Sequence, residues 1–408
     1  MTSETKVVTY RKGTTVVVQN QPNQGYFYIV RKGTLGIDSE HRLSDKNLSI
    51  FEEGDSFGLV SALTGHTFLV TIYANTDSEL LQIPINNLGT YLKSNYEIAR
   101  KIMGIYIREL KLLQKHLSRV NVLDAGSLAV ARLFDHAKTY LSWDKPQMAA
   151  HAYQTILALS QKEQYKNELA HLIEDAKSEL QKLEPFEPLF NENLKTLEVK
   201  PGGVIFLENE PGEEVYVITK GQVELIKIVR GHEYIVDELD SGEIFGEMSF
   251  IEHSVRMASA VSGTGATVLR LAPEDLLNEI GAVIMQKVFE SLARRIWFSH
   301  QRLIILKIEN PVTRLYALLY NMIRDKSIKK RTPNADTYHS EQIITTTLDN
   351  LKTMCGLLKI KDESIKTFLV DNNIEIQKNQ IIVRSRKRLE EKLIYFKTKS
   401  GQIASDLV

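Results

Sequence analysis

The chain of 408 residues contains one cysteine, Cys355, and carries no net charge, because 51 Lys and Arg balance 51 Asp and Glu. A single cysteine excludes a disulfide framework and any cysteine-rich zinc site, and it fits a reducing compartment. No apolar run approaches the ~18 residues that would span a bilayer. The first residues, MTSETKVVTY, lack the pattern of a signal peptide. We therefore expect a cytoplasmic protein without membrane contact.

Two motifs that often mark an enzyme are missing from the sequence. The ten histidines show neither HExxH nor another paired-ligand spacing, and no Walker-type GxxxxGK[ST] occurs. We therefore expect no catalytic residue, no metal site and no enzymatic activity.

An internal repeat is the main positive feature. Around its anchors, YFYIVRKGTLGI corresponds to EVYVITKGQVEL, and FEEGDSFG corresponds to LDSGEIFG. A repeated register of this kind indicates two copies of one domain. The anchor pairs, all 188 positions apart (216 − 28), are Tyr28 and Tyr216, Gly33 and Gly221, Gly54 and Gly242, Phe57 and Phe245, and Gly58 and Gly246.

Each copy reads as β structure followed by helix. VYVITKGQVELIKI is rich in β-branched residues and is broken by a Lys-Gly turn, and glycines punctuate the rest of the copy. Many short strands with glycine turns predict a sandwich, barrel or jelly roll. The segments 86–118 and 274–309 are poor in glycine and apolar at helical spacing, so we expect a helix after each copy.

A helical segment, 119–184, separates the copies and is broken at LSWDKPQ. AAHAYQTILAL has the small-and-aromatic texture of a tetratricopeptide hairpin, but a single unit cannot bury its own face and no period follows. A helical spacer is therefore favoured over a peptide-binding repeat.

The segment that indicates chemistry reads FGEMSF from Phe245 and RMASAV from Arg256. Gly246 lets the backbone approach a ligand closely, and consecutive N–H groups at a turn or helix start can hold a phosphate. The Arg256 guanidinium offers a fork of donors for phosphate oxygens, and an ionised Glu247 can accept from a ribose hydroxyl. Together they predict a site for a phosphate joined to a sugar.

These residues resemble the phosphate-binding cassette of the cyclic-nucleotide-binding domain, F-G-E-x-[AS]-[LF], a few variable residues, then R-x-A-[ST]. The upstream segment PGGVIFLENEPGEEVYVITKGQVEL matches the strand-turn signature of that family, a β-roll with flanking helices. The resemblance implies a cyclic mononucleotide as effector, with cyclic AMP expected, and no other cofactor. The ligand-binding residues that it implies are Gly246, Glu247, Met248, Ser249, Arg256, Met257 and Ser259.

The first copy lacks both polar ligands. Leu59 stands at the position of Glu247, and Phe68 stands at the position of Arg256. Neither side chain can pair with a phosphate, and an anion buried without a partner is costly. We expect no cyclic nucleotide in this copy, and a structural or partner-docking role instead.

The helix after the second copy extends the resemblance. LARRIWFSHQRLIILKIENPVTRLYALLYNMI resembles the long dimer helix of the catabolite activator and FNR-type regulators. This implies a homodimer through Leu292–Leu306 and an adenine contact by Ser299. A small residue at a helix seam explains Ser299 equally well, so the sequence does not fix the nucleobase.

The C-terminal segment 310–408 is basic, with 18 Lys and Arg against 11 Asp and Glu. Thr347 is a cap-like residue before an apolar-periodic segment, Gly356 follows it, a second helical segment runs to Leu369, and a hairpin is expected around Lys378-Asn379. This order resembles a winged helix-turn-helix of the catabolite activator type, a fold that implies double-stranded DNA as partner. The residues that we expect to bind DNA, through its phosphates, are Lys359, Lys361, Lys366, Arg384, Arg386, Lys387 and Arg388.

Asp362 and Glu363 depart from that family, since they stand where its members often present Arg to guanine.

Taken together, the sequence patterns and the resemblances predict an α+β multidomain protein, a cyclic-nucleotide-responsive transcription regulator. A signalling scaffold that senses the nucleotide without binding DNA is the alternative. The expected domains are a degenerate β-roll over 1–118, a helical linker over 119–184, a β-roll with dimer helix over 185–309 and a winged helix over 310–408.

Overall fold

The computed structural model forms two compact units, one comprising Met1–Tyr91, Ile105–Arg119 and Leu292–Val408, the other Leu92–Gly104 and Val120–Ser291. The long helices α3 (Tyr96–Ser118) and α9 (Glu279–Lys307) each contribute to both units. No helix among the described residues is long and apolar enough to cross a bilayer. The structure describes residues 4–38, 50–118, 128–183, 195–229, 231–252, 254–272, 279–329, 341–344, 346–357, 359–369, 373–377 and 380–400.

The first β domain consists of two four-stranded antiparallel sheets, in the orders β1-β8-β3-β6 and β2-β7-β4-β5. Val30, Phe57 and Leu80 of one sheet pack with Leu35 and Ile72 of the other, so the core lies between the sheets. The elements are β1 (Lys6–Tyr10), β2 (Thr15–Val17), β3 (Tyr26–Lys32), β4 (Leu35–Asp38), β5 (Ile50–Phe51), β6 (Ser56–Phe57), α1 (Leu59–Thr64), β7 (Thr71–Ala74) and β8 (Ser78–Pro84).

The second β domain repeats this arrangement with longer strands. A single strand, β11 (Val215–Val229), covers the positions of β3 and β4, and it pairs with β14 (Ser259–Leu271) through register shifts on both sides of Lys220-Gly221. Such bulges let a continuous strand bend. The other elements are β9 (Thr196–Val199), β10 (Val204–Phe206), β12 (His232–Asp240), β13 (Ile244–Phe245) and α8 (Glu247–Glu252).

The repeat anchors keep their roles in both copies. Tyr28 stacks on Phe57 with ring centroids 4.9 Å apart, and Tyr216 stacks on Phe245 at 5.2 Å. Gly221 has φ +81°, and a Cβ there would lie 2.0 Å from a backbone oxygen of β14, so only glycine fits. The two predicted jelly-roll-like β domains are therefore confirmed.

Helices follow the first β domain as expected: η2 (Ile85–Asn87), α2 (Leu88–Ser94) and then α3. The predicted helix over 274–309 is present as α9, while residues 273–278 lie outside the described part of the chain.

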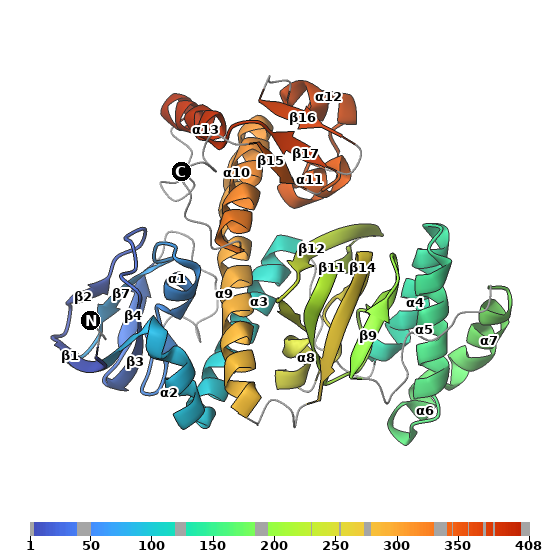
Figure 1. Cartoon of the computed structure of the whole chain (residues 1–408), viewed down its shortest axis with the longest axis horizontal. Helices are drawn as coiled ribbons and strands as arrows, with labels where there is room; N and C mark the ends of the chain where they lie inside the picture. The colour runs from blue at the N-terminus through green and yellow to red at the C-terminus, as the bar shows by residue number, and fades with distance from the viewer. Residues whose placement is uncertain are drawn as a thin grey trace. The chain divides into compact units, whose positions relative to one another are not determined.

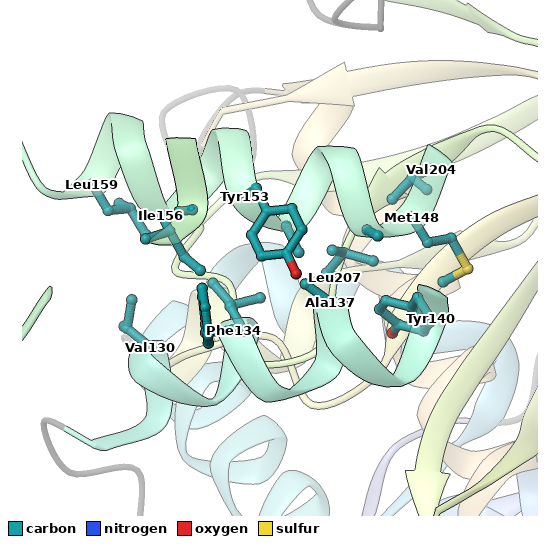
Figure 2. Close-up of a cluster of buried hydrophobic side chains, with 14 of the residues drawn as sticks. Val130, Phe134, Ala137, Tyr140, Met148, Tyr153, Ile156, Leu159, Val204 and Leu207 are labelled. Atoms are coloured by element: carbon teal, nitrogen blue, oxygen red, sulfur yellow. The ribbon is translucent and has the colours of Figure 1, made fainter. Parts of the chain in front are cut away.

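The segment between the copies is helical, with a break at the predicted place. The helices are α4 (Leu128–Ser142), α5 (Pro146–Leu159), α6 (Glu163–Leu169), η3 (Ala170–Leu172) and α7 (Ile173–Gln181). α4 and α5 form a hairpin whose core includes Phe134 and Tyr153 and continues into Val204 and Leu207 of the second β domain (Figure 1, Figure 2). The segment is thus more than a spacer, since it shares a core with that domain.

The C-terminal part combines helices with a small sheet. As the sequence predicted, Thr347 caps α11 (Leu348–Cys355), accepting a hydrogen bond from the Asn350 N–H, and Gly356 follows the helix. Gly356 ends the helix in a left-handed conformation. β17 (Ile381–Val383) pairs with both β15 (Gln342–Ile344) and β16 (Ile374–Ile376). The expected turn at Lys378-Asn379, between β16 and β17, lies outside the described residues. The remaining helices are α10 (Pro311–Lys329), α12 (Asp362–Phe368) and α13 (Arg386–Ser400), the last not anticipated.

Candidate functional site

The cassette of the second β domain begins with a left-handed turn at Gly246. Gly246 joins β13 to α8 at φ +84°, and a Cβ at this position would lie 2.8 Å from the Glu214 carbonyl oxygen. Only glycine tolerates both conditions. The turn places Glu247 at the first position of α8 with 1 % of its surface exposed.

Arg256 lies beneath this turn and is buried, with 3 % of its surface exposed. Its Nη1 donates to the carbonyl oxygens of Glu214 and Gly246, both at 2.9 Å, and to Ser249 Oγ at 2.6 Å. Its Nη2 donates to Glu214 Oε2 at 3.0 Å. Within the described part of the chain, its Nε has no hydrogen-bond partner. A buried guanidinium with a free donor is suited to an anionic ligand.

Aromatic rings complete the surroundings of Arg256. Its guanidinium carbon lies 4.4 Å from the centroid of the Phe206 ring and 5.7 Å from that of Tyr216. Burial raises the pKa of Tyr216, so this hydroxyl stays neutral. The rings hold the guanidinium plane by cation–π contact.

The other predicted ligand residues divide into two groups. Met248 and Ser249 are buried on α8, and Ser249 Oγ links the Gly246 carbonyl oxygen to Arg256. Met257 is half-buried beside Arg256. Ser259 is occupied otherwise, since its Oγ accepts from the Glu208 N–H at 2.9 Å and bonds with Tyr140 Oη at 3.0 Å.

Ser299 lies in the C-terminal half of α9 and is buried with 9 % exposed. It belongs to the first compact unit, whereas the cassette belongs to the second. Its contact with a nucleobase stays a prediction.

The first β domain has filled the place of the arginine with an amide. Asn23 Nδ2 donates to the carbonyl oxygens of Tyr26 and Gly58, both at 2.9 Å, and to Ser61 Oγ at 2.8 Å. At an offset of 188, these acceptors correspond to the three that Arg256 Nη1 reaches in the second copy. In the first copy, a neutral side chain therefore donates to the acceptors that a charged arginine reaches in the second.

The replacement of the arginine by an asparagine involves two positions in each copy, Asn23 and Phe68 in the first and Gly212 and Arg256 in the second. A Cβ at Gly212 would lie 2.7 Å from Arg256 Nη2, so Gly212 leaves room for the guanidinium. Comparison of the bridges Pro22–Thr67 and Pro211–Val255 shows that Gly212 is the counterpart of Asn23, one residue outside the 188 register. The sequence analysis missed Asn23, Gly212 and Glu214. The one-residue departure from the 188 offset becomes visible only when the β-bridges of the two copies are compared.

One segment of the first copy, Gly54-Asp55-Ser56-Phe57-Gly58, fits the G-x-S-x-G pattern of serine hydrolases. Ser56 lies in β6, opposite Ile29 of β3, and is 3 % exposed. A nucleophile elbow presents its serine to solvent, so this segment is structural. Among the described residues, no cluster of His, Cys, Asp and Glu could hold a metal ion.

Replacing Asn23 by alanine should destabilise the first β domain. The change removes the Nδ2 donor to Tyr26, Gly58 and Ser61 and the Oδ1 acceptor of the Gly25 and Tyr26 N–H groups. The loss of these part-buried hydrogen bonds should cost about 1–3 kcal/mol. Hydrogen exchange of the amides in Tyr26–Lys32 and Leu59–Thr64 should accelerate accordingly. The neighbouring exposed residue offers a control, Gln24→Ala, which should exchange like the parent protein. Equal exchange in both variants would contradict the structural role of Asn23.

Two curated proteins illustrate what the chain is similar to. It is 34% identical over 122 residues to a cyclic AMP receptor protein of Thermus thermophilus, a match that covers 29% of this chain and 56% of that protein. It is 22% identical over 282 residues to a cAMP-dependent protein kinase regulatory subunit of Mucor circinelloides f. lusitanicus, with 69% of this chain and 49% of that protein covered. The chain thus spans about half the length of these relatives.

A solved structure of a CRP-family transcriptional regulator, also from Thermus thermophilus, covers 48% of this chain and 95% of its own, with a TM-score of 0.36 and 18% identity. The family profile described as cyclic nucleotide-binding domain matches residues 7–95 and 196–282. These ranges coincide with the two β domains and include both cassettes. The chain therefore carries two copies of the cyclic nucleotide-binding domain.

Proposed function

We propose that the chain is a cyclic-nucleotide-responsive transcription regulator whose effector, expected to be cyclic AMP, binds in the second β domain. The buried Arg256, with its unused Nε donor beside the Gly246 turn, carries the proposal. Glu247 would accept from the ribose, and backbone amides near Gly246, Met248 and Met257 would complete the phosphate cradle. The ligand would act by favouring one of two poses of α9, which requires unequal affinity for the two.

The C-terminal part supports DNA as the second partner. The order α10, β15, α11, α12, β16 and β17 is compatible with a winged helix-turn-helix, in which α12 would be the reader and β16–β17 the wing. Of the seven basic residues expected at DNA, only Arg386 is half-buried, with its guanidinium 5.5 Å from the Tyr320 ring centroid. The exposed ones are Lys359, Lys361, Lys366, Arg384, Lys387 and Arg388.

The acidic start of α12 is partly neutralised. Lys352 Nζ of α11 donates to Asp362 Oδ1 at 2.6 Å. Arg384 is similarly engaged by Glu375 at 3.0 Å across the wing. Pairing Asp362 lowers the repulsion that a carboxylate near phosphates would cause, which favours the regulator over the scaffold.

The homodimer expected through Leu292–Leu306 needs an apolar face of α9 open to a partner. In the first compact unit, Trp297 is 1 % exposed, and His66 of the first β domain stacks on it at 3.5 Å between ring centroids. Arg324 Nη2 donates to His66 Nδ1 at 3.0 Å. Burial, and secondarily the charge of Arg324, lowers the pKa of His66 to about 3, so the ring is neutral and can accept. We propose that the degenerate domain replaces a second subunit at this face.

The effector site should bind one cyclic mononucleotide per chain. Arg256→Leu should weaken cyclic AMP binding at least about tenfold, because each hydrogen bond to a charged donor is worth about 1.5–3 kcal/mol. Calorimetric titration with cyclic AMP and cyclic GMP measures stoichiometry and affinity. Phe68→Leu, the same position in the first copy, is the matched control and should bind normally. Two molecules per chain, or normal binding by Arg256→Leu, would refute the assignment.

Light scattering at micromolar concentration should give the monomer mass of 46.4 kDa. The reason is that His66 and Arg324 already cover the Trp297 face of α9. The double variant His66→Ala, Arg324→Ala uncovers it and should associate more strongly than the parent. A dimer of the parent protein, with or without cyclic AMP, would contradict this proposal and support the homodimer expected from the sequence.

Duplex DNA binding should be salt-sensitive, with affinity falling roughly a hundredfold between about 50 and about 200 mM salt if several phosphates are contacted. Charge reversal at Arg384 and Arg388 should weaken binding to all sequences, whereas Lys361→Ala and Lys366→Ala should alter sequence preference. Selection of random duplexes with and without cyclic AMP tests both, with Lys177→Glu on α7 as the control. A monomer should select a single half-site. No DNA retained at low salt would leave the scaffold as the function.

A further inference from the structure

The α4–α5 hairpin contacts the second β domain at the segment that holds the cassette arginine. Its buried side chains form one cluster with Val204, Leu207, Ile226 and Val261 of that domain. Figure 2 shows Tyr140 and Met148 at the end of the hairpin nearest Val204 and Leu207. The apolar contact fixes the hairpin on the domain, and two polar contacts make it specific.

The first polar contact comes from α4. Tyr140 is fully buried, and its Oη lies 3.0 Å from Ser259 Oγ, three residues beyond Arg256. Ser259 Oγ also accepts from the Glu208 N–H at 2.9 Å. Burial raises the pKa of Tyr140, so the hydroxyl stays protonated. Through Ser259, Tyr140 thus connects α4 to the start of β14 and to Glu208.

The second polar contact comes from α5. His151 Nε2 lies 3.1 Å from Glu210 Oε2, which also accepts from the Leu207 N–H at 2.8 Å. Leu207–Glu210 form a tight turn, with Glu210 N–H bonded to the Leu207 carbonyl oxygen at 3.1 Å. Asn209 in this turn is held at φ +72°. We call this segment the 207–210 turn.

The 207–210 turn holds the backbone of Arg256 on both sides. The Arg256 N–H donates to the Glu210 carbonyl oxygen at 2.7 Å, and the Asn209 N–H donates to the Arg256 carbonyl oxygen at 2.8 Å. A buried side chain follows the position of its own backbone, so a displacement of the turn moves the guanidinium relative to Gly246 and Ser249.

We propose that the α4–α5 hairpin is a positioning element of the effector site: Tyr140 and His151 fix the 207–210 turn and, through it, Arg256. Hairpin docking and ligand affinity are therefore coupled, and the coupling is reciprocal. The inference rests on the proposed binding of a cyclic nucleotide at Arg256. The segment between the two copies would then regulate the site, since any change that loosens the hairpin would weaken binding of the effector.

Two conservative variants of the full chain test the proposal. Tyr140→Phe removes the hydroxyl that bonds Ser259, and it should raise the Kd for cyclic AMP about two- to tenfold, the equivalent of one lost buried hydrogen bond. Tyr153→Phe is the matched control, because Tyr153 lies in the same core and its buried Oη has no hydrogen-bond partner in the described part of the chain. His151→Leu should act like Tyr140→Phe.

Hydrogen exchange supplies a readout that does not need the ligand. Amides of the 207–210 turn and of Arg256 should exchange faster in Tyr140→Phe than in Tyr153→Phe, and cyclic AMP should slow exchange in α4 and α5 of the parent. Equal affinity and equal exchange in the two tyrosine variants would overturn the positioning role. A parent protein that binds no cyclic nucleotide would overturn the proposed function, while exchange at the turn would still decide whether the hairpin positions it.

Discussion

A buried guanidinium must be surrounded by acceptors, and much of the second β domain is arranged to supply them. Glu214, Gly246 and Ser249 each accept from Arg256, and Phe206 and Tyr216 cover its faces. A charge buried without such partners costs several kcal/mol. The left-handed turn at Gly246 and the missing side chain at Gly212 are consequences of this one requirement.

The first β domain meets the same requirement without a charge. Phenylalanine at position 68 offers no donor to the acceptors around Gly58, and the Asn23 amide donates to them instead. Its Oδ1 also accepts from the Gly25 and Tyr26 N–H groups, so the amide is saturated. A saturated neutral cassette does not depend on a ligand. In the same β domain, His66 stacks on Trp297.

Contiguous contacts run through each compact unit. In one, α5 reaches Arg256 through His151 and the 207–210 turn. In the other, α9 and α10 meet the first β domain through Trp297 and Arg324. Arg314 of α10 also donates from Nη1 to the Cys355 carbonyl oxygen, which ties α10 to α11. Burial raises the pKa of the Cys355 thiol to about 12, so this cysteine acts as a packing residue.

Local signals were enough to predict the two β domains, the helices between and after them, the cap at Thr347 and the cassette, because glycine turns, apolar periodicity and a short polar pattern can each be recognised within a few residues. They did not reveal α13, the packing of α4–α5 on the second β domain, or the tertiary bond that commits Ser259 to Tyr140. Asn23 taking the place of an arginine was also hidden, because the two residues occupy different chain positions. These features emerge only in the folded chain, since a hydrogen bond depends on where donor and acceptor meet in space rather than on their register in the sequence.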